Sequence, residues 1–131
     1  MTPEQLLAEP FGTLSELVSM HARRAPARRA VVEGERDIDW GGLDAAASRV
    51  AARLQQDGLG PREVVAICAP MSIEYVVVFV GALRAGLTVA PISPTLTPES
   101  IAAMTADCGA RRVYRGECDC VDHLRSRHHY F

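Results

Sequence analysis

The feature that most constrains the fold is an alternation of short apolar runs with capped helical segments. Residues 64–69 form a compact apolar run, which is typical of a strand that is buried on both faces. Residues 73–85 follow with the end signals of a helix, because Ser72 can cap the first turn and Gly86 can stand just after the last one. These segments predict one strand followed by one helix.

The same order continues toward the C-terminus. Residues 87–93 predict another strand, and Thr97 is a strong helix start, with Pro98 in the first turn and an acidic residue behind it. Gly109 ends this helix, and residues 111–115 predict one more strand.

A further strand and helix precede this region. Asp39 can cap a helix whose apolar residues recur at helical spacing, and residues 36–40 form a short β-type run in front of it. From residue 36 onward, strands and helices therefore alternate with short connections, which predicts an α/β fold with a parallel sheet and right-handed crossover helices. Residues 30–33 and 36–40 lie around Gly34, so they also predict a hairpin or two edge strands.

The amino-terminal helix is predicted from its end signals. Thr13 and Glu16 have the spacing of a capping box, and Pro26 ends the helix. The Arg-rich residues 21–30 are interpreted as a solvated turn, because positive charges at a helix C-terminus interact favourably with the helix dipole. The net charge of -2 and the pI near 6.1 favour neither nucleic acid nor an anionic membrane as a partner.

The composition excludes several kinds of chemistry. The 131 residues suit one domain, and all 14 Lys-plus-Arg positions are Arg, so no lysine can hold a phosphate or form a Schiff base. The start of the sequence has no basic segment typical of a secretory signal, and the apolar run at residues 75–83 is about half of a bilayer span. We predict no membrane span, reduced thiols and a cytoplasmic location.

No residue is assigned a catalytic or cofactor-binding role from the motifs. Gly41 and Gly42 follow Trp40 without the third glycine of a dinucleotide fingerprint, so they are interpreted as a helix start. No G-x-S-x-G motif is present. Cys68 and Cys108 stand in apolar surroundings and are predicted to be inert core thiols.

The C-terminal residues 116–131 differ from the rest of the chain. They are polar, lack helix or strand periodicity, and are predicted to form a disordered tail. The tail offers side chains that zinc or copper would accept: Cys118, Cys120, His123, His128 and His129. Their spacing matches no known ligand framework, so we assign no metal site.

Residues 13–115, read together, resemble the opening of the AMP-forming adenylating enzymes. This superfamily includes acyl-CoA synthetases, aryl-CoA ligases and the adenylation domains of peptide synthetases. The resemblance is carried by a long ordered pattern, including the A-G-x-x-x-x-P-x-x-P run at Ala85, Gly86, Pro91 and Pro94 after a capped helix.

Departures from the family pattern are Trp40, Gly42 and Met71, where the family often has Tyr, Glu and Asn. The proline-containing residues 91–100 resemble those of acyl and aryl ligases more than those of peptide synthetases.

The resemblance implies an activity for the complete family enzyme. That enzyme activates a carboxylate with ATP and Mg²⁺ to an acyl-adenylate and passes it to CoA or a carrier thiol. The family's phosphate loop, ribose-binding Asp, hinge and catalytic Lys all lie beyond this segment. We therefore expect residues 1–115 to be a partial adenylate-forming N-terminal domain that is inactive alone and binds neither ATP, Mg²⁺ nor CoA.

Three explanations of such a chain stay open at this point. It is a truncated or frameshifted product or the N-terminal piece of a split ligase, whose partner is the missing remainder. Alternatively, it is a stand-alone interaction module that docks through an exposed sheet edge. The third alternative is a metal-binding tail on an inert scaffold.

Overall fold

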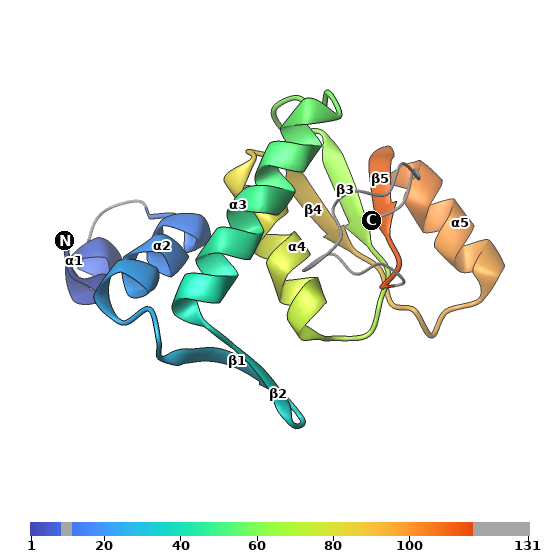
Figure 1. Ribbon diagram of the computed structural model, residues 1–131. Helices are drawn as coiled ribbons and strands as arrows, with labels where there is room; N and C mark the ends of the chain where they lie inside the picture. Colours follow the sequence, from blue (N-terminus) through green and yellow to red (C-terminus); the bar gives the residue numbers. More distant parts are fainter. Residues whose placement is uncertain (9–11, 117–131) are drawn as a thin grey trace.

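The structure, a computed structural model, describes residues 1–8 and 12–116 (Figure 1). The helices and strands are, in chain order, α1 (Pro3–Ala8), α2 (Leu14–Arg24), β1 (Arg29–Glu33), β2 (Arg36–Asp39), α3 (Trp40–Gln56), β3 (Val64–Ile67), α4 (Ile73–Arg84), β4 (Thr88–Pro91), α5 (Pro98–Asp107) and β5 (Ala110–Tyr114).

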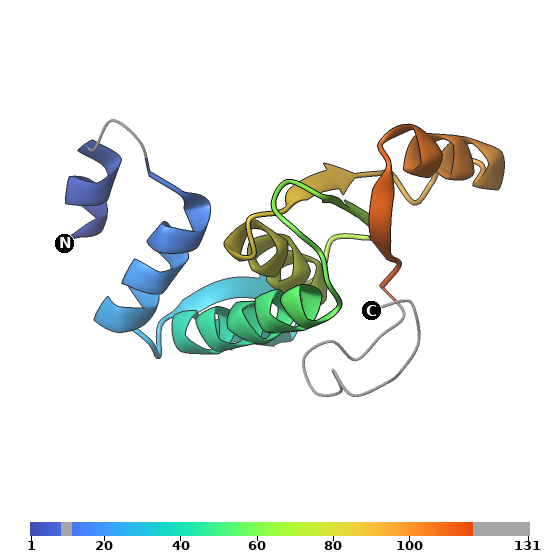
Figure 2. The ribbon, with the colours of Figure 1, turned by 90° about the horizontal axis from the view of Figure 1, so that it is seen from above.

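The centre of the fold is a three-stranded parallel sheet in the order β4-β3-β5. Helices α3 and α4 lie on one face of this sheet and α5 lies on the other, as Figures 1 and 2 show from two directions. Successive residues of the central strand point to opposite faces, so Val65 packs with α3 and α4 while Ala66 packs on the α5 side. The predicted α/β fold with a parallel sheet and crossover helices is confirmed.

One strand does not join the parallel sheet as the alternating order predicted. Strand β2 pairs antiparallel with β1 in a separate two-stranded sheet, with Val32 opposite Asp37 and Glu33 opposite Arg36. The reason is the tight turn at Gly34, whose φ of 60° lets the chain reverse at once. Strands joined by so short a turn must run antiparallel, so the hairpin prediction is confirmed and the parallel placement of residues 36–40 is wrong.

The predicted helix starts are all present. The hydroxyl of Thr13 accepts a hydrogen bond from the amide of Glu16 at 3.1 Å, and the Glu16 carboxylate accepts one from the amide of Thr13 at 3.0 Å. The side chains of Asp39, Ser72 and Thr97 each accept a hydrogen bond from the amide three residues on, at the starts of α3, α4 and α5. These side chains occupy amides that have no partner within their own helix, which fixes where each helix begins.

The short helix α1 was not predicted, although its start carries a similar signal. The amide of Gln5 donates to the Thr2 hydroxyl at 3.1 Å, and the amide of Thr2 donates to the Gln5 side chain at 2.6 Å. Pro3 stands at the first helical position, where a missing N–H costs nothing.

The main hydrophobic core lies between α3, α4 and the sheet. Its fully buried side chains include Leu43, Val50 and Leu54 of α3 and Val77 of α4. Gly81 lets the two helices approach closely, because a Cβ placed on it would lie 2.6 Å from the Cβ of Val50. Within residues 1–8 and 12–116, no helix combines the length and the apolar character needed to cross a bilayer.

Candidate functional site

The glycine pair at the start of α3 forms a close-packed helix start. The amide of Gly42 donates to the Asp39 carboxylate at 2.7 Å, and a Cβ on Gly41 would lie 3.3 Å from Pro26. A carboxylate on the exposed amides of a helix N-terminus takes the place that a phosphate would need and repels it. The arrangement suits chain packing and does not suit a nucleotide phosphate.

Three side chains with chemically reactive groups, His21, Cys68 and Cys108, lie in structural positions. The ring of His21 stacks on Trp40, with centroids 4.5 Å apart and an interplanar angle of 19°. Cys68 is buried at the end of β3, and the Cys108 thiol donates to the carbonyl of Thr105 at 3.4 Å. Cys68 is therefore the core thiol that was predicted, whereas Cys108 is only partly buried.

The candidate metal ligands of the C-terminal tail, residues 118–129, lie outside the described residues. In the part of the chain that the structure describes, no group of three or more His, Cys, Asp and Glu side chains could hold a metal ion.

The Arg-rich turn is solvated, as predicted. Its charges make two long ion pairs: Arg24 with Glu4 at 3.8 Å and Arg29 with Asp37 at 3.6 Å. Both arginine side chains are more than half exposed, so these pairs contribute little to stability.

A polar network that was not predicted from the sequence is centred on Arg84, in the last turn of α4. Its guanidinium donates to the hydroxyls of Ser15 at 2.8 Å, Ser19 at 2.9 Å and Ser48 at 2.8 Å. It also forms an ion pair with Asp44 at 2.8 Å and donates to the Asp44 carbonyl at 2.9 Å. One side chain thus joins α4 to both α2 and α3.

A signal for this network was present in the sequence. Ser15 and Ser19 are four residues apart on α2, and Asp44 and Ser48 are four residues apart on α3. Each spacing places two polar groups on the same side of a helix. The guanidinium of one arginine on a third helix carries five N–H donors, so it can donate to both pairs.

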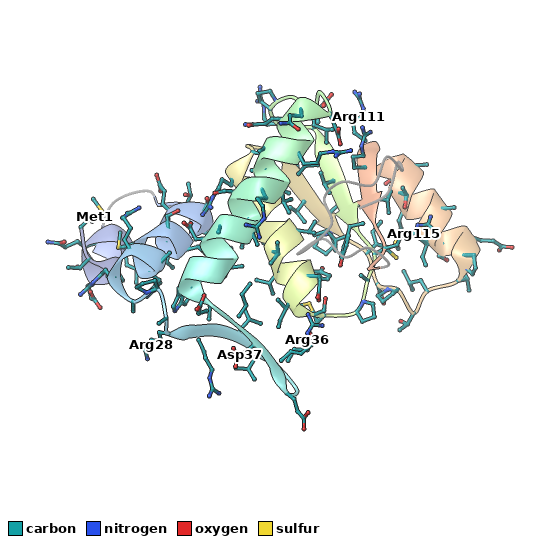
Figure 3. The ribbon with its side chains drawn as sticks, in the orientation of Figure 1. Met1, Arg28, Arg36, Asp37, Arg111 and Arg115 are labelled. Atoms are coloured by element: carbon teal, nitrogen blue, oxygen red, sulfur yellow. The ribbon has the colours of Figure 1, made fainter. Side chains whose placement is uncertain are left out.

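A second network attaches the β1–β2 hairpin to the start of α4. Glu33 accepts a hydrogen bond from the amide of Ile73 at 3.0 Å, and Arg36 forms a salt bridge with Glu74. Figure 3 shows Arg36 directed toward this end of α4. Partial burial raises the pKa of Glu74, but hydrogen bonds from Arg36, from the backbone amide of Glu74 and from Ser72, together with the Arg36 charge, hold that pKa below its ordinary value.

Met1 and one side of α2 border a hollow of about 430 Å³. It is lined by Met1, Ser15, Glu16, Ser19, Met20 and Arg23. Its two serine hydroxyls already bind Arg84, and its carboxylate already binds the amide of Thr13. The hollow therefore has few groups left with which to bind a small molecule.

The side of the molecule formed by α5 and β5 differs from the core side. Helix α5 has no buried residue, and Leu96 and Met104 are 37% and 48% exposed. Across residues 1–8 and 12–116, no strand pairs with the outer edge of β5. The same statement holds for the outer edge of β4, so the sheet has two free edges among the described residues.

The fold is an α/β domain in which Arg84 links three helices and Arg36 links the hairpin to α4. A profile of the AMP-binding enzyme family matches residues 18–129. The chain belongs to this family.

Sequence comparison identifies relatives among peptide synthases. A component of linear gramicidin synthase from Brevibacillus parabrevis is 39% identical over 97 residues, which cover 74% of this chain and 1% of the relative. Bacitracin synthase 1 from Bacillus licheniformis is 33% identical over 119 residues, which cover 86% of this chain and 2% of the relative. The chain therefore spans only a small part of these relatives.

A solved structure shows the same fold. The N-terminal domain of FACL13 from Mycobacterium tuberculosis superposes with a TM-score of 0.76 at 24% sequence identity. The match covers 89% of this chain and 31% of that domain. The fold of this chain thus matches about a third of that domain.

Proposed function

We propose that this chain is the scaffold-forming N-terminal part of an amino-acid-activating adenylation domain and that it catalyses nothing by itself. The relatives at 33–39% identity are named as synthases of gramicidin and bacitracin, which supports an amino acid as the carboxylate substrate of the whole enzyme. The resemblance of residues 91–100 favours an acyl or aryl ligase over a peptide synthetase, and the named relatives do not confirm that preference.

In the reaction of the whole enzyme, a carboxylate oxygen attacks the α-phosphorus of ATP and pyrophosphate leaves. Negative charge on the transferring group needs several positive groups and amide donors close together. The family uses ATP, but the residues described here do not fit a nucleotide: the chain has no lysine, and Asp39 occupies the amide of Gly42. They do not fit Mg²⁺ either, because no cluster of acidic ligands is present within residues 1–8 and 12–116.

The observation that carries the proposal is the way in which this chain uses its charged side chains. Arg84 holds α2, α3 and α4 together, and Arg36 holds the hairpin against α4. These contacts fix the positions of α2, α3, α4 and the β1–β2 hairpin relative to one another. We assign to this chain the role of supporting catalytic residues that a longer polypeptide supplies.

The test is an ATP–pyrophosphate exchange assay on the purified chain with a panel of amino acids and aromatic acids. We expect no exchange above the rate of a buffer blank, and no stoichiometric binding of ATP by calorimetry. Exchange that depends on one carboxylic acid, or tight binding of one ATP per chain, would contradict the proposal.

A further inference from the structure

We infer that the Arg-rich turn, residues 21–30, and the hollow beside α2 together bind an acidic segment of a partner polypeptide. The two features are continuous, because Arg23 belongs to the turn and also lines the hollow. Figure 3 shows Met1, another residue of the hollow, and Arg28 of the turn at the same end of the molecule. The inference goes beyond the proposed function, since it assigns a partner to a part of the chain outside the parallel sheet.

Positive charge is concentrated in the Arg-rich turn. Residues 21–30 contain four of the 14 arginines and no acidic residue, although the whole chain has 16 acidic residues. Arg23 and Arg24 stand in the last turn of α2, where the helix dipole favours a cation. Arg28 and Arg29 follow beyond the end of the helix, where that effect has faded. The stability of α2 therefore does not account for the second pair of arginines.

Neighbouring carboxylates neutralise only part of this charge. All four arginines are exposed. Arg24 and Arg29 each pair with one carboxylate, at 3.8 and 3.6 Å. In the part of the chain that the structure describes, no carboxylate forms an ion pair with Arg23 or Arg28. Since long and exposed ion pairs are weak, carboxylates from a partner can bind the two unpaired arginines and replace the two existing pairs.

The hollow adds an apolar contact to this surface. Met1 and Met20 are its apolar lining residues, and Arg23 is its cation. The serine hydroxyls and the carboxylate of the lining already make hydrogen bonds within the chain. An apolar side chain of a partner can therefore enter the hollow without leaving these groups unsatisfied, while a carboxylate beside it pairs with Arg23.

The charge of the whole chain favours a polypeptide over a nucleic acid. A guanidinium binds carboxylates and phosphates alike, so the turn alone does not decide between them. A nucleic acid carries a negative charge at every nucleotide and spreads over a wide surface. It would meet the rest of this chain, which has a net charge of -2 although the turn is basic. A short acidic segment places its few carboxylates on the turn alone.

The experiment uses the full chain and, as the probe, a fluorescein-labelled peptide in which leucine alternates with pairs of glutamate. Binding is measured by fluorescence anisotropy at low and at physiological ionic strength. We expect saturable 1:1 binding that weakens as salt is added. The double variant Arg23→Gln/Arg28→Gln is expected to bind about fivefold more weakly, because two exposed ion pairs are lost. Replacing the leucines of the probe by serine should also weaken binding, because the contact in the hollow is lost.

The double variant Arg49→Gln/Arg62→Gln is the matched control. It removes two exposed arginines from α3 and from the segment before β3, so the net charge changes by the same amount while the turn stays intact. We expect this control to bind the probe like the unmodified chain. Circular dichroism and urea unfolding show that both double variants are folded before they are compared.

Three outcomes would overturn the inference. The first is the absence of saturable binding, and the second is an equal loss of affinity in the two double variants, since only net charge would then matter. The third is a single-stranded thymidine oligonucleotide of the same length that binds as tightly as the peptide, because the turn would then be a general polyanion site. None of these outcomes bears on the proposed function, which fails separately if the chain alone carries out ATP–pyrophosphate exchange.

Discussion

The two sides of this molecule differ in how closely their helices and strands are packed. On the α2–α3–α4 side, α3 packs closely against Gly81 of α4. The Arg84 guanidinium of α4 donates hydrogen bonds to groups on both α2 and α3. On the β5–α5 side, α5 buries none of its residues, and within residues 1–8 and 12–116 no strand pairs with the outer edge of β5. The difference indicates that close packing in the described chain is concentrated on the α2–α3–α4 side.

The largest expected effect comes from shortening one apolar side chain on each side. Leu54 is fully buried, so Leu54→Ala is expected to lower the free energy of unfolding by about 2–5 kcal/mol. Met104 is 48% exposed, and Met104→Ala is expected to change it by less than about 0.5 kcal/mol. Equilibrium urea unfolding measures both, and similar losses for the two variants would remove the distinction between the sides.

A second prediction concerns the close contact between α3 and α4 at Gly81. A Cβ on Gly81 would lie 2.9 Å from the backbone oxygen of Ala47 as well as against Val50, and the backbone cannot easily move away. Gly81→Ala is therefore expected to destabilise the chain by about 1–3 kcal/mol. Gly60→Ala is the control, because no atom lies within 4 Å of its added Cβ. If Gly81→Ala unfolds at the same urea concentration as Gly60→Ala, α3 and α4 do not pack this closely.

The third prediction tests the Arg84 network. Its side chain is only 17% exposed, and replacing it by Met keeps the apolar stem but leaves the Asp44 carboxylate without its cation. We expect Arg84→Met to cost about 1–1.5 kcal/mol and to make α2 more accessible to protease. Arg111→Met breaks an ion pair with Glu63 that is more exposed, and should cost less than about 1 kcal/mol. Equal costs for the two variants would mean that Arg84 is an ordinary surface arginine.

Helix starts could be predicted from the sequence because their signals are local. The caps at Thr13, Asp39, Ser72 and Thr97 each depend on a side chain and an amide three residues away. Thr2 and Gln5 have the same three-residue spacing and make the same kind of hydrogen bonds at the start of α1, which was not predicted. Local chemistry therefore accounts for most of the elements and their order.

The partners of a strand were harder to predict, because pairing depends on the connection and not on the strand. Residues 36–39 have the same β-type character as the strands of the parallel sheet, yet the turn at Gly34 commits them to a hairpin. The Arg84 network was missed for a related reason. Its acceptors lie 36 to 69 residues away in sequence, and only the packing of three helices brings them together.

The smallest expected effect is a pH dependence at the hairpin attachment. Although partial burial raises the pKa of Glu74, hydrogen bonds, the strongest from Arg36, and the Arg36 charge hold it below its ordinary value of 4.5. The folded state therefore holds this carboxylate ionised more strongly than the unfolded state does. The resulting stability is present above pH 4.5 and is lost as the pH falls through the lower pKa of the folded chain. Glu74→Gln should therefore be less stable than the unmodified chain near neutral pH, and the difference should shrink under acidic conditions. Arg36→Gln should show the same reduced pH dependence, because it removes the cation that lowers the pKa. A difference between Glu74→Gln and the unmodified chain that stays constant with pH, measured by urea unfolding, would show that Glu74 does not couple the hairpin to α4 through its charge.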